Sequence, residues 1–157
     1  MTTNPTLPVF LLFLHVLAVA FWVGGMAVMH LAVRPAAVAT LQPPQRLPFM
    51  AAALSRFFTG VSIAVAVALL SGLALIGLSG GFAHIHWRVH GMFAIGLLMM
   101  ALFLHIRFAP FRRLRRAVAE AVWPVAAAQL NTIRRLVSVN LVLGVGVFAL
   151  AILGRAF

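Results

Sequence analysis

Residues Leu7–Val33 read LPVFLLFLHVLAVAFWVGGMAVMHLAV, a run that contains no Asp, Glu, Lys or Arg. A helix needs roughly 20 mostly apolar residues to cross the hydrocarbon core of a bilayer, and this run exceeds that length. The preceding residues, MTTNPT, carry no Lys or Arg, and the run is too long for the apolar centre of a cleavable signal peptide. The run therefore predicts a first membrane-spanning helix.

Three further stretches have the same character. The first two connectors are marked by helix-breaking residues, which are Pro35 with the Pro43-Pro44 pair, and then Gly80-Gly81. The four predicted spans cover residues 7–33, 57–79, 87–106 and 136–154. We therefore expect an all-α fold, an integral membrane four-helix bundle, in which residues 1–157 form a single transmembrane domain.

The composition fits a membrane protein and excludes several other classes. Hydrophobic residues make up 64% of the 157 residues and charged residues only 8%, whereas an ordinary soluble domain is about a quarter charged. The chain has no Cys, so disulfides, zinc fingers, iron–sulfur ligation and thiol catalysis are excluded. Glu120 is the only acidic residue, which leaves no ligands for EF-hands or two-metal sites.

All twelve basic residues are Arg, and most lie on one predicted side of the membrane. The other side holds only Arg88 and Arg155, whereas the first and third connectors with their flanks hold ten: Arg34, Arg46, Arg56, Arg107, Arg112, Arg113, Arg115, Arg116, Arg134 and Arg135. The positive-inside rule then places these connectors in the cytoplasm and both termini outside, in a bacterial-type inner membrane. We expect the basic connector between the third and fourth spans, Arg107–Arg135, to form an amphipathic helix on the membrane surface. Its partner would be the anionic cytoplasmic leaflet rather than nucleic acid.

Histidines are the remaining reactive groups, and depth along the predicted spans divides five of them into two groups. His15, His86 and His90 lie towards the outer side, whereas His30 and His105 lie towards the inner side. His15 and His30 are fifteen residues apart, as are His90 and His105, so each pair lies near one helix face and spans about 22 Å. Facing imidazoles at matching depth in a membrane bundle are typical axial ligands of haem b. The pattern predicts one haem in the outer group and allows a second at the inner pair.

Other interpretations of these residues stay open. A membrane histidine often only hydrogen-bonds between helices, and His30 and His105 lie near a boundary where water is available. His84 is expected to be a solvated loop residue. Arg88 lies between two of the outer histidines, where a guanidinium suits haem propionates, and anionic lipid is its alternative partner.

Four methionines offer a competing interpretation, because thioether and imidazole ligands together suit Cu(I). Met26 and Met29 precede His30, and Met99 and Met100 lie in the third span. They lack the dense, repeated spacing of a copper path, so packing as flexible hydrophobic residues is the favoured interpretation.

Span one resembles a known family of membrane proteins. It reads LHVLAVAFWVGG over Leu14–Gly25, with His15 followed seven residues later by Trp22. This resembles the first helix of the copper-resistance D (CopD-like) family and of the related HemJ-type protoporphyrinogen oxidases. The tail QLNTIRRLVSVNLVLGVGVFAL, from Gln129 to Leu150, is similar to the last helix of CopD-like domains.

Two further segments carry the same resemblance. Thr59-Gly60 and Ser71-Gly72 are similar to elements of the family's second helix, and IHWRVH, at 85–90, resembles the HemJ-type Leu-His-Ile-Lys element. The resemblance implies a four-helix membrane protein, with haem b in the HemJ-type branch and copper handling in the CopD-type branch. It also implies His86 as the partner of His15, whereas the fifteen-residue spacing favours His90.

The favoured function at this stage is a membrane haem b protein that transfers electrons as an oxidoreductase, with a quinone or an outer-side redox partner. In such a protein the cofactor supplies the chemistry, while the chain supplies ligands and electrostatics. One alternative is copper import or copper resistance without haem. Another is a non-catalytic assembly subunit. A homo-oligomer or a larger membrane complex is also expected.

Overall fold

The computed structural model describes residues 6–155, which lie in helices and in short connections between them. The elements are α1 (Thr6–Val28), the π-helical turn η1 (Met29–Val33), α2 (Arg34–Thr40), α3 (Pro43–Leu78), the 3-10 turn η2 (Phe82–His84), α4 (Trp87–Phe108), α5 (Pro110–Ala119), α6 (Trp123–Ile152) and the 3-10 turn η3 (Leu153–Arg155). No strand occurs within residues 6–155. The predicted all-α fold is confirmed.

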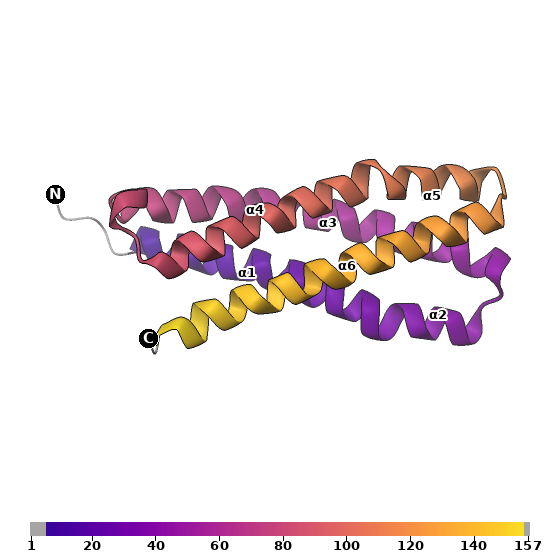
Figure 1. The fold of residues 1–157 in the computed structure, drawn as a ribbon, viewed down its shortest axis with the longest axis horizontal. Helices are drawn as coiled ribbons and strands as arrows, with labels where there is room; N and C mark the ends of the chain where they lie inside the picture. Colours follow the sequence, from indigo (N-terminus) through magenta and orange to yellow (C-terminus); the bar gives the residue numbers. More distant parts are fainter. Residues whose placement is uncertain (1–5, 156–157) are drawn as a thin grey trace.

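Successive helices join end to end into four long rods (Figure 1). The rods cover Thr6–Thr40, Pro43–Leu78, Trp87–Ala119 and Trp123–Ile152, and each is long and apolar enough to cross a membrane. α1 begins and α6 ends at the same end of the bundle. Large apolar side chains such as Phe13, Ile63 and Val142 point outwards, as expected for helices surrounded by lipid. The chain is therefore a multi-pass membrane protein built as a four-helix bundle.

Two rods begin much earlier than the sequence predicts. α3 starts at Pro43 and α6 at Trp123, whereas the predicted spans start at residues 57 and 136. The predicted bounds follow apolar windows alone, but an amphipathic helix continues wherever one of its faces finds a packing partner. Leu47 and Ile133, both 2% exposed, provide such a face in the added segments.

Pro35 does not end the first rod, contrary to the prediction. It lies at the start of α2, which follows directly on the π-helical turn η1. A widened turn leaves room for a residue without a backbone N–H, so the rod continues to Thr40. The chain reverses at Leu41 and Gln42, and Pro43 occupies the first turn of α3, where its missing N–H has no intrahelical partner to lose.

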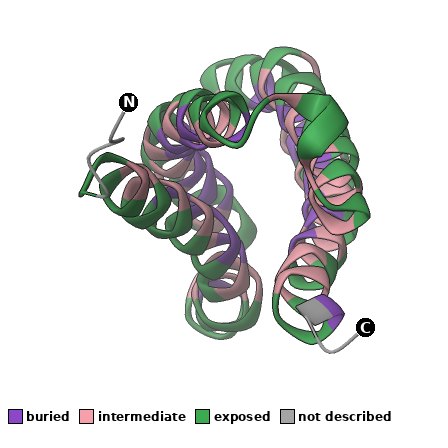
Figure 2. Cartoon of the chain, turned by 90° about the vertical axis from the view of Figure 1, so that its left-hand side faces the viewer, coloured by how far each residue is buried: buried purple, intermediate pink, exposed green. Residues whose placement is uncertain are grey.

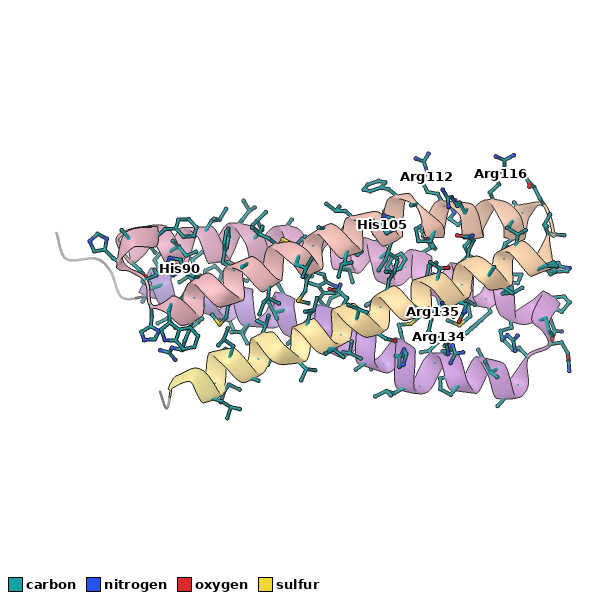
Figure 3. The ribbon with its side chains drawn as sticks, viewed as in Figure 1. His90, His105, Arg112, Arg116, Arg134 and Arg135 are labelled. Atoms are coloured by element: carbon teal, nitrogen blue, oxygen red, sulfur yellow. The ribbon has the colours of Figure 1, made fainter. Side chains whose placement is uncertain are left out.

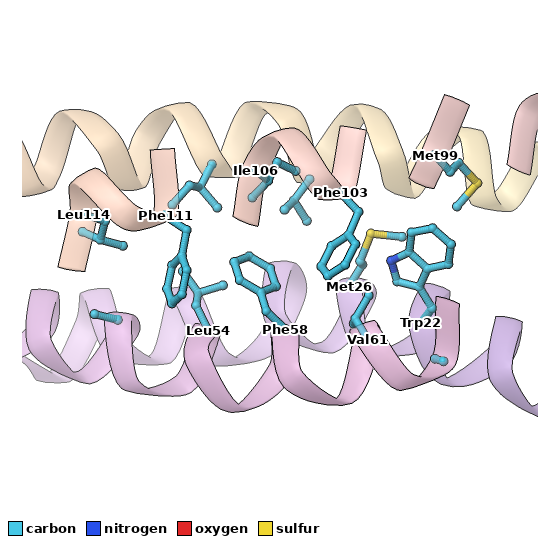
Figure 4. Close-up of a cluster of buried hydrophobic side chains, with 14 of the residues drawn as sticks. Trp22, Met26, Leu54, Phe58, Val61, Met99, Phe103, Ile106, Phe111 and Leu114 are labelled. Atoms are coloured by element: carbon cyan, nitrogen blue, oxygen red, sulfur yellow. The ribbon is translucent and has the colours of Figure 1, made fainter. Parts of the chain in front are cut away.

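The centre of the bundle is a cluster of aromatic and aliphatic side chains, shown in Figure 4. Phe58 of α3 meets Phe103 of α4 and Phe111 of α5 edge to face, at ring-centroid distances of 5.8 and 4.9 Å. Trp22 of α1 also meets Phe103 edge to face, at 6.1 Å. Such pairs each contribute roughly 0.5–1.5 kcal/mol beyond the area they bury. These aromatic contacts join three of the four rods, and Ile133 and Val137 of α6 bring the fourth rod into the same cluster.

α5 packs as part of the bundle, whereas the sequence predicts that it lies on the membrane surface. Its buried residues Phe111, Leu114 and Ala117 lie where α5 contacts α3 and α6. Arg112 and Arg116 point away from the bundle (Figure 3). The amphipathic pattern is correct, but protein covers the apolar face, because the early start of α6 brings its first turns alongside α5.

The rods associate as two pairs, with α1 along α3 and α4 along α6. Small residues permit the close approach of the first pair. A Cβ added at Gly25 would meet the ring of Phe57, and one at Gly60 would meet Phe21. In Figure 2, which looks along the rods, buried residues line the sides on which helices meet and exposed residues cover the outward sides.

Candidate functional site

His15, on α1, is held by hydrogen bonds to α3. Its Nδ1 lies 2.9 Å from the carbonyl oxygen of Ala68 and 3.2 Å from Oγ of Ser71. Because a carbonyl oxygen only accepts, the tautomer is assigned with the proton on Nδ1, which donates to Ala68. The Ser71 hydroxyl donates to the carbonyl of Val67, one turn earlier, so its oxygen is a second acceptor for His15.

Gly72 provides the space for this imidazole. A Cβ added at Gly72 would lie 3.1 Å from Cε1 of His15 and 3.4 Å from its Nδ1. The first distance is shorter than ordinary van der Waals contact, so a larger residue would displace the ring. Ser71 and Gly72 thus act together: one supplies an acceptor, and the other leaves room.

The hydrogen bonds of His15 leave one ring nitrogen available. With the proton on Nδ1, the neutral ring carries a lone pair on Nε2, and no described residue hydrogen-bonds to that atom. Metal-binding histidines almost always donate their other ring N–H to a carboxylate, a backbone carbonyl or water, which fixes the tautomer and the ring orientation. His15 therefore has the hydrogen-bond arrangement of a metal ligand.

His86 and Arg88 contact each other at the start of α4. The backbone N–H and the Nε of Arg88 donate to Nδ1 of His86, at 3.4 and 3.1 Å, so His86 is the N-cap of the helix. Because Nδ1 accepts these bonds, the proton of the neutral ring lies on Nε2. In this arrangement neither ring nitrogen has a free lone pair for a metal ion. The structure places His86 as a helix cap, and metal ligation by His86 stays a prediction.

His90 and His84 are exposed at the same end of the bundle. Each donates from Nδ1 to a backbone carbonyl four residues earlier, His90 to His86 at 3.4 Å and His84 to Gly80 at 2.9 Å. The exposure of His84 agrees with the prediction of a loop residue. Within the described residues, no hydrogen bond or ring contact joins either side chain to His15.

The inner histidines lie apart from this end. His30 is partly buried in η1, and His105 is exposed in the last turn of α4. Figure 3 shows His105 well separated from His90 along the same rod. Within residues 6–155, no group of three His, Cys, Asp or Glu side chains is arranged to hold a metal ion. Ligation by the pair His30 and His105 stays a prediction.

Two of the four methionines belong to the central cluster. Met26 and Met99 are 2% and 3% exposed and lie beside Trp22 and Phe103 in Figure 4, as the packing interpretation predicts.

Asn140 of α6 donates from Nδ2 to the carbonyl oxygen of Met99 at 3.4 Å. Its Oδ1 is buried and has no hydrogen-bond partner among the described residues, which costs about 1–3 kcal/mol of stability.

The sequence does not reveal the residues that orient His15. Ala68 contributes only its backbone carbonyl, so its identity carries no signal. In the sequence, Ser71-Gly72 is a pair of small residues similar to an element of the family's second helix, and nothing in it points to His15. Their role depends on the register of α1 against α3, which brings residues more than fifty positions apart into contact.

The fold defines a multi-pass membrane protein with one oriented, partly buried imidazole. The chain belongs to the copper resistance protein D family, since the sequence profile of that family matches residues 51–153. No curated protein and no solved structure matches the chain. The matched range begins within α3, so it contains the partners of His15 but not His15 itself. The CopD-like resemblance is confirmed, and membership of this family favours copper over haem.

Proposed function

We propose that this protein binds copper ions within its membrane bundle and acts in copper uptake or copper tolerance. The observation that carries the proposal is His15, whose Nδ1–H is bound to the carbonyl of Ala68 while Nε2 keeps its lone pair. Membership of the copper resistance protein D family supports copper as the ion. Imidazole nitrogen is a suitable copper ligand, so the chemistry of His15 agrees with the family.

A single oriented imidazole is better suited to a protein that passes copper ions across the membrane than to one that stores them. An ion that crosses a membrane must bind well enough to enter and weakly enough to leave. His15 offers one nitrogen in the half of the bundle where α1 begins, and it is neither fully exposed nor fully buried. Met26 and Met99 are part of the packed core, and we assign them no copper.

The test is Cu(I) binding by the purified protein, measured by competition with a chromophoric chelator, together with cellular copper content. His15→Ala should lower the affinity at least about tenfold and remove the effect of the protein on copper content. His84→Ala is the matched control, because His84 makes the same bond from Nδ1 to a carbonyl but lies in an exposed turn. If the two variants behave alike, His15 is not the copper ligand.

Haem b is the second candidate, and the geometry of His15 supports it too, because Nε2 of an oriented histidine is also the usual axial ligand of haem iron. His15 and His90 would then hold the group, since His86 is engaged as a cap, and the haem would supply electron transfer to a quinone or an outer-side partner. The visible spectrum of the reduced protein separates the candidates. Sharp haem bands that disappear in His15→Ala would support electron transfer. Bound copper without haem would support the first proposal. A protein that binds neither copper nor haem would support an assembly role.

We further propose that the protein lies in a bacterial-type inner membrane with both termini outside. The support is the distribution of arginines, since Arg112, Arg116, Arg134 and Arg135 all lie in the half of the bundle away from the end where α1 begins (Figure 3). A reporter that is active only in the cytoplasm, fused after residue 157, should be inactive. Activity of that fusion would reverse the orientation.

A further inference from the structure

A small cavity at the basic end of the bundle is lined by three arginines from three helices. It has a volume of about 120 Å³ and lies between α2, α3 and α6. Arg34, Arg46 and Arg134 contribute guanidinium groups, and Asn131 adds an amide. The remaining lining is mostly apolar and includes Leu47. All three arginines are half-buried, unlike the arginines of α5, whose side chains are exposed.

No acidic side chain within residues 6–155 balances the charge in this cavity. Arg46 and Arg134 both repel the guanidinium of Arg34. Glu120 is the only acidic residue of the chain, and it pairs with Arg116 at 2.8 Å. Bringing like charges together in a partly desolvated site is unfavourable unless an anion compensates them. Three convergent cations without an acid therefore indicate a ligand with negative charge.

We propose that Arg34, Arg46 and Arg134 form a binding site for a phosphate group. Guanidinium groups match phosphate oxygens in a bidentate fork, and three of them supply more donors than one phosphate can accept. The amide of Asn131 is a further donor, and the apolar lining next to the arginines suits a ligand with an apolar portion. The phosphate belongs either to an anionic lipid headgroup or to a small soluble phosphate. The inference does not depend on copper, because the cavity is formed without any residue of the His15 site.

The experiment compares two triple variants with the same change of charge. Arg34→Gln, Arg46→Gln and Arg134→Gln together remove the site. Arg112→Gln, Arg113→Gln and Arg115→Gln together are the control, since these side chains are exposed on α5. Full-length protein is purified in delipidating detergent, and the midpoint of thermal unfolding is followed at constant ionic strength. One arm adds inorganic phosphate against chloride, and the other uses phosphatidylcholine nanodiscs with or without phosphatidylglycerol.

We expect the added phosphate or anionic lipid to reverse which of the two proteins, the wild type or the site variant, has the higher unfolding midpoint. In chloride alone and without anionic lipid, the site variant should unfold at or above the wild-type midpoint, because removing the arginines relieves their repulsion. With the anion, the wild type and the α5 control should gain stability, whereas the site variant should not. Arg34→Gln alone should weaken the apparent affinity about tenfold, and it serves as the second variant if the triple variant does not fold.

The two arms distinguish the source of the phosphate. Stabilisation by inorganic phosphate that is lost only in the site variant identifies a soluble phosphate ligand. The same pattern with phosphatidylglycerol alone identifies a lipid headgroup, and the pattern in both arms shows that the phosphate group itself is recognised. The proposal is overturned if neither anion stabilises the wild type, or if the site variant and the α5 control respond equally. Copper binding should be unchanged in the site variant. The phosphate proposal and the copper proposal can therefore fail independently of each other.

Discussion

Replacing Asn140 with Leu should stabilise the bundle, although it removes a hydrogen bond between helices. Asn140 is 1% exposed, its Nδ2 donates to the carbonyl of Met99 at 3.4 Å, and its Oδ1 has no partner among the described residues. Leu has the same branching of heavy atoms and places methyl groups where the two polar atoms lie. The substitution therefore exchanges one long hydrogen bond and one unsatisfied acceptor for apolar contact.

Three contributions determine the size of this effect. Loss of the hydrogen bond costs about 0.6 kcal/mol, the average for polar contacts between membrane helices. Removal of the unsatisfied carbonyl recovers about 1–3 kcal/mol. Leu is favoured over Asn in a helix by about 0.5 kcal/mol. The free energy of unfolding should therefore rise by about 1–3 kcal/mol, and each kcal/mol corresponds to about 2–4 °C in Tm for a chain of this size.

The assay is thermal unfolding of the purified protein in a single detergent. Asn140→Ala is the second variant, because it removes both polar atoms without adding bulk and should be nearly neutral. Thr132→Leu, at an exposed position of the same helix, reports the effect of Leu outside the core. If both substitutions at Asn140 lower the unfolding free energy by more than about 1 kcal/mol, Oδ1 has a bound partner, and the reasoning fails.

Two further predictions concern α3 and have controls on the same helix. Gly72→Ala should displace the imidazole of His15 by a few tenths of an ångström and weaken metal binding several-fold, because the new Cβ would lie 3.1 Å from Cε1. Gly77→Ala, where a Cβ meets nothing within 4 Å, should leave binding unchanged, and an equal loss in both would contradict the assigned geometry. Phe58→Ala should lower the free energy of unfolding by about 3 kcal/mol, since its 1% exposed ring is the centre of the aromatic cluster. Phe49→Ala, at a 46% exposed position, should change it little, and similar losses at both sites would show that the cluster is not the main source of stability.

The number and order of the spans follow from the sequence, whereas the ends of the helices do not. Hydropathy is low between residues 43 and 56 because of Arg46 and Arg56, so the prediction starts the second span only at residue 57. Leu47 and Leu54 recur on one face of that segment and are buried at 2% and 5% exposure. The mean hydropathy of a sequence window does not reveal such a face, because the arginines elsewhere on the helix lower the mean. The same averaging hides the first turns of α6.

The candidate site was only partly accessible to sequence reasoning, for a related reason. His15 is conspicuous because an ionisable group inside an apolar run is unusual. Its orientation depends on a backbone carbonyl and on the absence of a side chain at Gly72, and neither has a sequence signature. His86 shows the opposite problem. The predicted start of the third span at residue 87 agrees with α4, but the role of His86 as a cap depends on the side-chain conformation that brings its Nδ1 to the backbone N–H of Arg88.

The lengths of the rods show how one bundle accommodates both proposed sites. α3 has 36 residues, which is about 54 Å of helix and exceeds the roughly 30 Å of a hydrocarbon core. Part of the bundle must therefore lie outside the core, and the half that carries the arginines is the part that water can solvate. Burial along α4 is uneven, because this helix has no buried residue before Met99, whereas α3 has buried residues along its length from Leu47 to Ile76.

This division has a physical reason and a functional consequence. The hydrophobic effect holds helices together in water, but between helices in lipid only packing and polar contacts remain. The arginine half can therefore keep three guanidinium groups in a fixed arrangement around a phosphate. The helices have far more contacts within each of the two pairs than between the pairs. The proposed passage of copper at His15 would require the two helix pairs to separate slightly, which the small number of contacts between them permits.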